Sequence, residues 1–301
     1  MKELSQKLLD NNTITNLNLE KNNITCEGIK YLSISLIKNK SIKSISIGWN
    51  NIGNIGIKYL SHSLEKNDTT KALNIQENNI KEEGMKYLSV CLAKNTTLTN
   101  LNLCNNRISD RGILYLSESL KNNQVLKSLD LSGNKLTEND IKRLSESLIS
   151  NNTLKSLSLR KNNISNEGFK NLSLALIEND SITHLNLEYN LINDDCSSSL
   201  CDLLSRNSTL ININLRFNQF TDDGVNSFLS SLYENNNLCQ INFGSNQISY
   251  ELLSLIDAHL SDNISNKRRK QTMLLIRKQK CSCVSILPRR LLIYLLQFLH
   301  D

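Results

Sequence analysis

The sequence has 301 residues, 39% hydrophobic and only 5% aromatic, with a single proline at Pro288 and a formal net charge of +6. This composition supports a core and favours a regular repeated architecture over an irregular globule. Residues 264–301 hold nine Lys and Arg against one acid, so residues 1–263 carry a net charge of −2. A near-neutral body argues against nucleic-acid binding, which usually needs a basic surface.

The first segment, residues 1–11, is amphipathic, and we expect it to form an N-terminal capping helix. Leu4, Leu8 and Asn11 occupy positions that recur in the helical half of every later unit. A solenoid needs such a half unit to cover its first open face. Because this helix begins directly after Met1, we expect no signal peptide.

Residues 12–263 consist of nine units of 28 residues without insertion. In each unit the pattern is L-x-x-L-x-L-x-x-N-x-I, as in Leu98, Leu101, Leu103, Asn106 and Ile108. The alternating L-x-L predicts a short strand with one buried face, and the Asn predicts a tight turn in which a buried amide bonds backbone groups of two neighbouring repeats. This Asn is present in all nine units: Asn22, Asn50, Asn78, Asn106, Asn134, Asn162, Asn190, Asn218 and Asn246.

The second half of each unit predicts a helix. Residues such as Thr137 and Ser165 suit its N-cap, and apolar residues follow at helical spacing. A Gly recurs near the helix start, where we expect close packing between neighbours. A second Asn column, such as Asn67 and Asn179, closes the helix, and we expect it to cap the C-terminus in the left-handed conformation.

The repeat is similar to the leucine-rich repeats of the ribonuclease-inhibitor-like subfamily. That group also includes the sensor regions of nucleotide-binding immune receptors and the Ran GTPase-activating protein. The resemblance implies an α/β solenoid with a curved parallel sheet on the concave face and helices on the convex face. Because these relatives differ in function, the resemblance does not identify a partner.

In this fold, side chains that alternate with the strand leucines face the concavity, and we expect a protein partner to bind there. Tyr189 and Phe217 are predicted to be neighbours, and aromatic residues with Arg are typical interface anchors. The alternative is that these residues cover the edge of the strands without a partner. The predicted binding residues are Glu20, Trp49, Arg160, Glu188, Tyr189, Arg216 and Phe217.

No catalytic, cofactor or metal site is predicted. The four histidines fall in different columns of the repeat, and His184 is interpreted as an exposed residue of the concave face. Cys281 and Cys283 lack a second Cys or His pair for zinc. We therefore expect a non-enzymatic, monomeric protein. Regulation of small GTPases stays an alternative, although the Ran GTPase-activating relatives usually have an acidic tail and this one is basic.

The tail, residues 264–301, predicts a basic helical segment. Residues 287–299 follow the pattern L-P-x-x-L-L-x-x-L-L-x-F-L, which resembles the opening helix of an F-box, the module that docks substrate receptors onto cullin-type ubiquitin ligases. The segment has Arg290 where an acid is common and lacks the later F-box helices. The alternatives are a helix that covers the last repeat and a basic segment at a membrane surface. The residues of the docking pattern are Leu287, Pro288, Leu291, Leu292, Leu295 and Phe298.

We expect a cytoplasmic location. The eight cysteines show no disulfide framework, and glycosylation at Asn23 or Asn163 would block repeat stacking. No apolar run is long enough to span a bilayer. The Asn, Lys and Ile bias suggests AT-rich coding. Such repeats occur in protists and in bacteria that deliver proteins into host cells, and for a delivered protein the cytosol is the host's.

Overall fold

The computed structural model describes residues 1–280, and side chains up to Lys267. Its strands are three residues long, lie in sequence order and pair in parallel in one sheet, each residue opposite the residue 28 positions later. The strands are β1 (Asn16–Asn18), β2 (Ser44–Ser46), β3 (Ala72–Asn74), β4 (Asn100–Asn102), β5 (Ser128–Asp130), β6 (Ser156–Ser158), β7 (His184–Asn186), β8 (Asn212–Asn214) and β9 (Gln240–Asn242).

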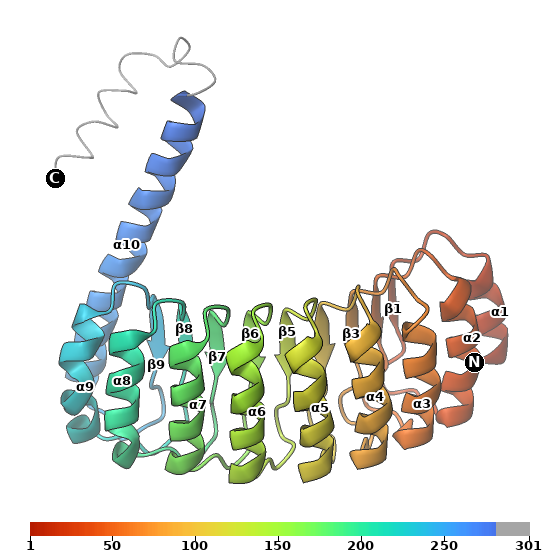
Figure 1. Ribbon diagram of the computed structural model, residues 1–301, viewed down its shortest axis with the longest axis horizontal. Coiled ribbons are helices and arrows are strands. Elements are labelled where there is room, and N and C mark those ends of the chain that lie inside the picture. The colour runs from red at the N-terminus through yellow and green to blue at the C-terminus, as the bar shows by residue number, and fades with distance from the viewer. Residues whose placement is uncertain (281–301) are drawn as a thin grey trace.

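A helix precedes β1, and one follows each strand. Together they form an outer layer along the array (Figure 1). The helices are α1 (Lys2–Leu9), α2 (Cys26–Lys38), α3 (Gly53–Leu64), α4 (Glu82–Lys94), α5 (Asp110–Asn122), α6 (Glu138–Ser150), α7 (Asn166–Glu178), the short 3-10 helix η1 (Asp194–Cys196) with α8 (Ser197–Arg206), α9 (Asp222–Glu234) and α10 (Tyr250–Lys280).

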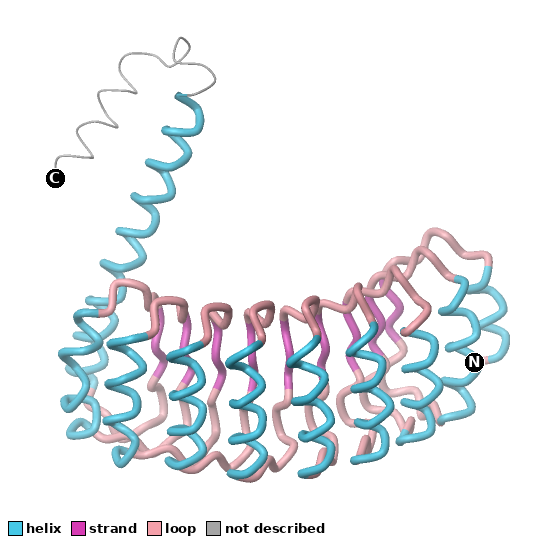
Figure 2. The backbone as a smooth tube through the Cα atoms, in the orientation of Figure 1, coloured by secondary structure: helices cyan, strands magenta, loops and turns pink. Residues whose placement is uncertain are grey.

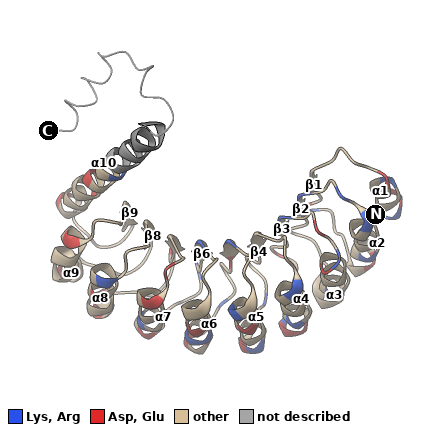
Figure 3. Ribbon diagram, turned by 45° about the horizontal axis from the view of Figure 1, so that its top comes forward, with Lys and Arg blue, Asp and Glu red and all other residues tan. Residues whose placement is uncertain are grey.

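The array is an arc (Figure 2), with the strands along its inner curve and the helices along its outer curve (Figure 3). The α/β solenoid predicted from the repeat is therefore confirmed. Helices are wider than the strand spacing of about 4.8 Å, so stacking them bends the sheet toward the strand side. The core is one continuous cluster, mainly of Leu and Ile, between the two layers, and the strand leucine Leu157 is fully buried.

The amides that follow the strands bond neighbouring repeats to one another, as predicted. The side-chain amide of Asn134 donates to the carbonyl of Leu103 in the preceding repeat at 3.1 Å and to that of Leu131 in its own at 2.9 Å. Its oxygen accepts the backbone N–H of Asn106 at 3.0 Å. One side chain thus satisfies backbone groups on both sides of a repeat junction, which three-residue strands cannot do alone.

The Asn column at the helix ends has a different conformation from the predicted one. Asn179 has an extended backbone, with φ −97° and ψ 120°, rather than the left-handed cap expected from the sequence. Its amide nitrogen donates to the carbonyl of Leu148 in the preceding repeat at 2.7 Å, and its oxygen accepts the N–H of Ile182 at 2.8 Å. The residue is therefore a second bond between repeats and the start of a turn toward the next strand.

The predicted N-cap role holds at Thr137 and Ser165, whose hydroxyls accept the N–H groups of Asp140 and Gly168. The side chains at the same position of other helices, Thr25, Ser109 and Thr221, make no such bond. The Gly column does mark close approaches. A Cβ on Gly224 would lie 1.9 Å from a carboxylate oxygen of Asp194, which belongs to the preceding repeat. That carboxylate also accepts the backbone N–H of Thr221 at 2.9 Å, so only a glycine leaves room for it.

The last helix, α10, continues well beyond Asn263, where the repeat pattern ends, and leaves the body of the arc (Figure 1). Asn263 donates to the carbonyls of Asn235 and Leu238, and Lys267 to that of Asn237. The bond from Asn263 to Asn235 continues the Asn column of the earlier repeats, and the bond from Lys267 joins α10 to the loop before β9. Within residues 1–280, no helix is both long and apolar enough to cross a lipid bilayer.

We predict that Asn134→Ala lowers the free energy of unfolding by about 3 kcal/mol, because it leaves buried backbone groups of two repeats without partners. Asn22→Ala is the matched control, since Asn22 is exposed and its amide donates only to the carbonyl of Glu20. We expect this change to cost less than about 1 kcal/mol. Urea denaturation followed by circular dichroism measures both, and equal losses would contradict an inter-repeat role for the column.

Candidate functional site

The residue just before each turn Asn has a left-handed backbone throughout the array. Its φ is 50° at Trp49, 56° at Tyr189 and 52° at Phe217, and a glycine with φ 67° occupies the same position at Gly133. A side chain other than that of glycine is strained in this region, at a cost of order 1 kcal/mol for each residue. The aromatic rings of Trp49, Tyr189 and Phe217 occupy this position, which Lys, Glu, Asn, Ser and Gly occupy in the other repeats.

Tyr189 and Phe217 are stacked, as their predicted proximity suggested. Their ring centres lie 4.0 Å apart, with an interplanar angle of 8°. The backbone N–H of Tyr189 donates to the carbonyl of Arg216 in the next repeat at 3.0 Å, which extends the ladder of the sheet to this position and fixes the separation of the two rings. Tyr189 remains 41% exposed, so the stack is open to a partner.

Two arginines and a glutamate complete this group. Cζ of Arg160 lies 5.0 Å from the ring centre of Tyr189, and Cζ of Arg216 lies 5.1 Å from that of Phe217. Both distances allow a cation–π interaction. Nε of Arg160 lies 3.5 Å from Oε2 of Glu188, which also accepts a hydrogen bond from the amide of Asn214 at 3.2 Å. Arg160, Glu188, Tyr189, Arg216 and Phe217 are called the aromatic–arginine cluster below.

The remaining predicted residues, Glu20 and Trp49, lie at the other end of the sheet. Nζ of Lys21 lies 5.0 Å from the ring centre of Trp49, which is 42% exposed. Glu20 accepts hydrogen bonds from Ser46 and from the amide of Asn74. Five strand spacings, roughly 24 Å, separate Trp49 from Tyr189, so the structure does not bring the two groups together.

His184 is exposed on the inner face, as predicted. It lies opposite Ser156 and Asn212, and its Nδ1 is 2.8 Å from the hydroxyl of Thr183. Cys104 is a half-buried thiol in the same column of the repeat as Arg160 and Glu188. Burial, together with the carboxylates of Asp130 and Glu77, raises the pKa of this thiol to about 11, so it is protonated at neutral pH.

Metal binding finds no support in the part of the chain with described side chains, where no group of three His, Cys, Asp or Glu residues is placed to hold an ion. The six cysteines of this part are free thiols. Cys281, Cys283 and the F-box-like pattern lie outside the described residues. That pattern comprises Leu287, Pro288, Leu291, Leu292, Leu295 and Phe298.

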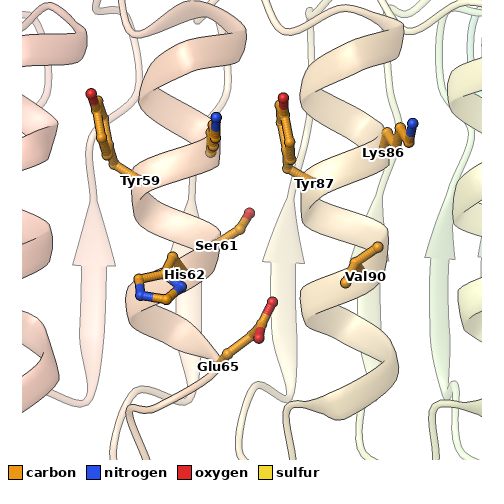
Figure 4. Close-up of a pocket in the computed structure, with 8 residues that line it drawn as sticks. Tyr59, Ser61, His62, Glu65, Lys86, Tyr87 and Val90 are labelled. Atoms are coloured by element: carbon orange, nitrogen blue, oxygen red, sulfur yellow. The ribbon is translucent and has the colours of Figure 1, made fainter.

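Two hollows were not predicted from the sequence. One, of about 480 Å³, lies on the outer face at α3 and α4, and its lining includes Tyr59 and His62 of α3, Glu65 just after it, and Tyr87 and Val90 of α4 (Figure 4). The other, of about 560 Å³, lies between α10 and the beginnings of β7–β9. The tyrosines belong to a column that aligning the units at 28 residues would have revealed: Tyr31, Tyr59, Tyr87 and Tyr115.

Comparison with known families agrees with this architecture. A family model described as "Leucine Rich repeat" matches six segments of the chain, residues 10–33, 38–61, 94–117, 122–145, 150–173 and 206–229. The chain is a leucine-rich-repeat protein. The ribonuclease-inhibitor-like subfamily stays a prediction. A search of curated protein sequences finds no match to this leucine-rich-repeat chain.

Solved structures similar to this leucine-rich-repeat protein include the actin-binding site 2 of Leiomodin-1, with 23% identity, a TM-score of 0.42, and coverage of 48% of this chain and 87% of that one. The tropomodulin C-terminal domain of Caenorhabditis elegans is similar at 17% identity and a TM-score of 0.43, covering 49% of this chain and 90% of the other. Each likeness therefore spans about half of this chain.

We predict that the Tyr189–Phe217 stack contributes a coupling free energy of about 0.5–1.5 kcal/mol, the usual range for aromatic pairs. Tyr189→Gly, Phe217→Gly and the double variant form the cycle, because glycine keeps the left-handed backbone without strain. Free energies of unfolding in urea give the coupling. Glu77→Gly and Asn105→Gly are the control pair, adjacent in the same column, for which we expect additivity within about 0.5 kcal/mol. Additivity in both pairs would contradict the prediction.

We also predict that Cys104 reacts with iodoacetamide about a hundredfold more slowly at pH 8 than a thiol with the ordinary pKa of 9.0, since only the thiolate reacts. The sign follows from the raised pKa. At every pH below about 11, the thiolate fraction of Cys104 is smaller than that of an ordinary thiol at the same pH. Peptide mapping by mass spectrometry measures the rate at this site. Labelling as fast as that of a free thiol would contradict the protonated, half-buried state.

Proposed function

We propose that this protein is a non-catalytic scaffold that binds a partner protein on its inner face, at the aromatic–arginine cluster. The observation that carries the proposal is the exposed Tyr189–Phe217 stack at two left-handed positions, with the guanidinium groups of Arg160 and Arg216 beside the rings. Aromatic and arginine side chains supply most of the binding energy in many protein interfaces.

The cluster is ordered before any partner arrives, which favours affinity. The rings are held by each other and by the backbone ladder, and Arg160 is held by Glu188, whose side chain is only 15% exposed. A partner that binds such a surface loses little side-chain entropy on the scaffold side. Because Glu188 is already bonded to Arg160 and Asn214, the groups that the cluster offers to a partner are its aromatic rings and its guanidinium groups.

The inner face also has the shape that such a partner requires. Nine strands form one continuous surface on the inside of the arc, so a protein or an extended segment can contact several repeats at once (Figure 3). Solenoids commonly use their concave surfaces in this way. A binding role needs no cofactor and no reactive group, in keeping with the protonated thiol of Cys104.

Charge reversal tests the site. We expect the double variant Arg160→Glu and Arg216→Glu to lose the partner that the wild-type protein captures from cytosol, with affinity falling at least about tenfold, since it removes both cations from the interface. Quantitative mass spectrometry of the captured proteins, followed by titration of the enriched partner, measures the loss.

The matched control is the double variant Arg111→Glu and Arg143→Glu. It makes the same change in net charge on the outer helices α5 and α6. We expect this control to capture the partner as the wild-type protein does. Retained capture by the inner-face variant, or equal loss by both variants, would move the binding site away from the aromatic–arginine cluster.

A further inference from the structure

Four lysines lie in one column at the edge of the sheet where the strands begin. Each immediately precedes a strand: Lys43, Lys71, Lys127 and Lys155, before β2, β3, β5 and β6. All four are exposed. This set is called the lysine row below. The backbone places its members in neighbouring pairs, because Lys71 donates to the carbonyl of Lys43 at 2.7 Å, and Lys155 to that of Lys127 at 2.8 Å.

The side chains of this column reach the same surface as the inner-face residues. The hydroxyl of Thr99, which occupies the column at β4, donates to the side chain of Asn100 at 2.7 Å. Two further members, Ile211 and Cys239, line the hollow beside α10 together with His184. The lysine row is therefore continuous with the inner face rather than with the outer helices.

The lysine row has no anionic partner in the described part of the chain. None of its four ammonium groups lies within 4.0 Å of a carboxylate there, although other surface lysines such as Lys40 and Lys94 form such pairs. The adjacent inner-face column is uncharged at these repeats: it holds Ser44, Ala72, Ser128 and Ser156. Like charges on neighbouring strands repel at a spacing of about 4.8 Å, so folding alone does not account for the two lysine pairs.

We propose that the lysine row binds an acidic segment of the partner protein. The inference rests on the proposed binding at the inner face and specifies the chemistry of what binds there. From β2 to β6 the row spans four strand spacings, roughly 20 Å, which an extended peptide of about six residues covers. Two pairs of carboxylates on such a segment would face the two pairs of lysines, with the gap at Thr99 between them.

A protein segment fits this surface better than a nucleic acid does. A polyphosphate chain presents a negative charge at every nucleotide, and the same inner face carries Glu77 and Asp130 in the repeats that the row spans. The row also lacks interleaved aromatic side chains on which bases could stack. An acidic peptide can place its carboxylates only where the lysines are.

The test uses the full chain and a fluorescein-labelled peptide of eight alternating Asp and Gly residues, with an uncharged Ser–Gly peptide as the blank. We expect measurable binding of the acidic peptide at low salt, and at least about a tenfold loss in the variant Lys43→Glu, Lys71→Glu, Lys127→Glu and Lys155→Glu. Fluorescence anisotropy gives the Kd. Circular dichroism checks that the variant remains folded.

The matched control reverses four exposed lysines on the outer side, Lys38, Lys66, Lys86 and Lys142, so that both variants have the same net charge. We expect the control to bind the peptide within about threefold of the wild-type Kd. Equal loss in both variants would show a net-charge effect and overturn the proposal, as would unchanged binding by the row variant.

Two further measurements separate the alternatives. If a single-stranded RNA of eight nucleotides binds the row more tightly than the acidic peptide does, the partner is a nucleic acid and the proposal is wrong. The Arg160→Glu and Arg216→Glu variant distinguishes the two functional claims. If that variant loses the captured partner while the lysine-row variant keeps both partner and peptide, binding at the cluster stands and the acidic segment is overturned.

Discussion

The architecture depends on one constraint, which is that every backbone group left unpaired by a three-residue strand must find a partner in the next repeat. The two asparagine columns meet this requirement. Asn134 serves the turn after the strand, and Asn179 serves the turn before it, and each bonds a carbonyl of the preceding repeat. Leucine and isoleucine burial favours association of the units, but buried apolar surface is not directional. The amides fix the register at 28 residues.

This constraint explains why the fold could be predicted from the sequence and the site only in part. Asn residues repeat because their hydrogen-bonding partners are backbone atoms, which are the same in every unit. The strand, turn and helix of each unit could be predicted for that reason. The conformation of Asn179 could not, since the sequence shows an amide at a helix end without showing that its partner, the carbonyl of Leu148, lies in another repeat.

The repeat period predicts that Tyr189 and Phe217 of the aromatic–arginine cluster are neighbours. It does not predict how the rings and guanidinium groups are oriented, because side-chain torsions are not set by the repeat. The lysine row was missed for a different reason. The net charge of residues 1–263 is near zero, so the total charge does not reveal a local row of lysines. The acids that balance these lysines lie elsewhere, for example at Glu118 and Glu167 on the outer helices. Aligning the units by their period would have revealed it.

The left-handed residue before each turn has a consequence for how such a protein changes. Its backbone is held by the ladder and by the adjacent amide, and its side chain takes no part in either. Lys, Trp, Glu, Asn, Gly, Tyr, Phe and Ser all occupy it in this one chain. Each repeat therefore has one position whose side chain can be substituted without changing the backbone hydrogen bonds that hold the residue in place. A substitution at this position can therefore change what the inner face binds in one repeat without removing the hydrogen bonds that join the repeats.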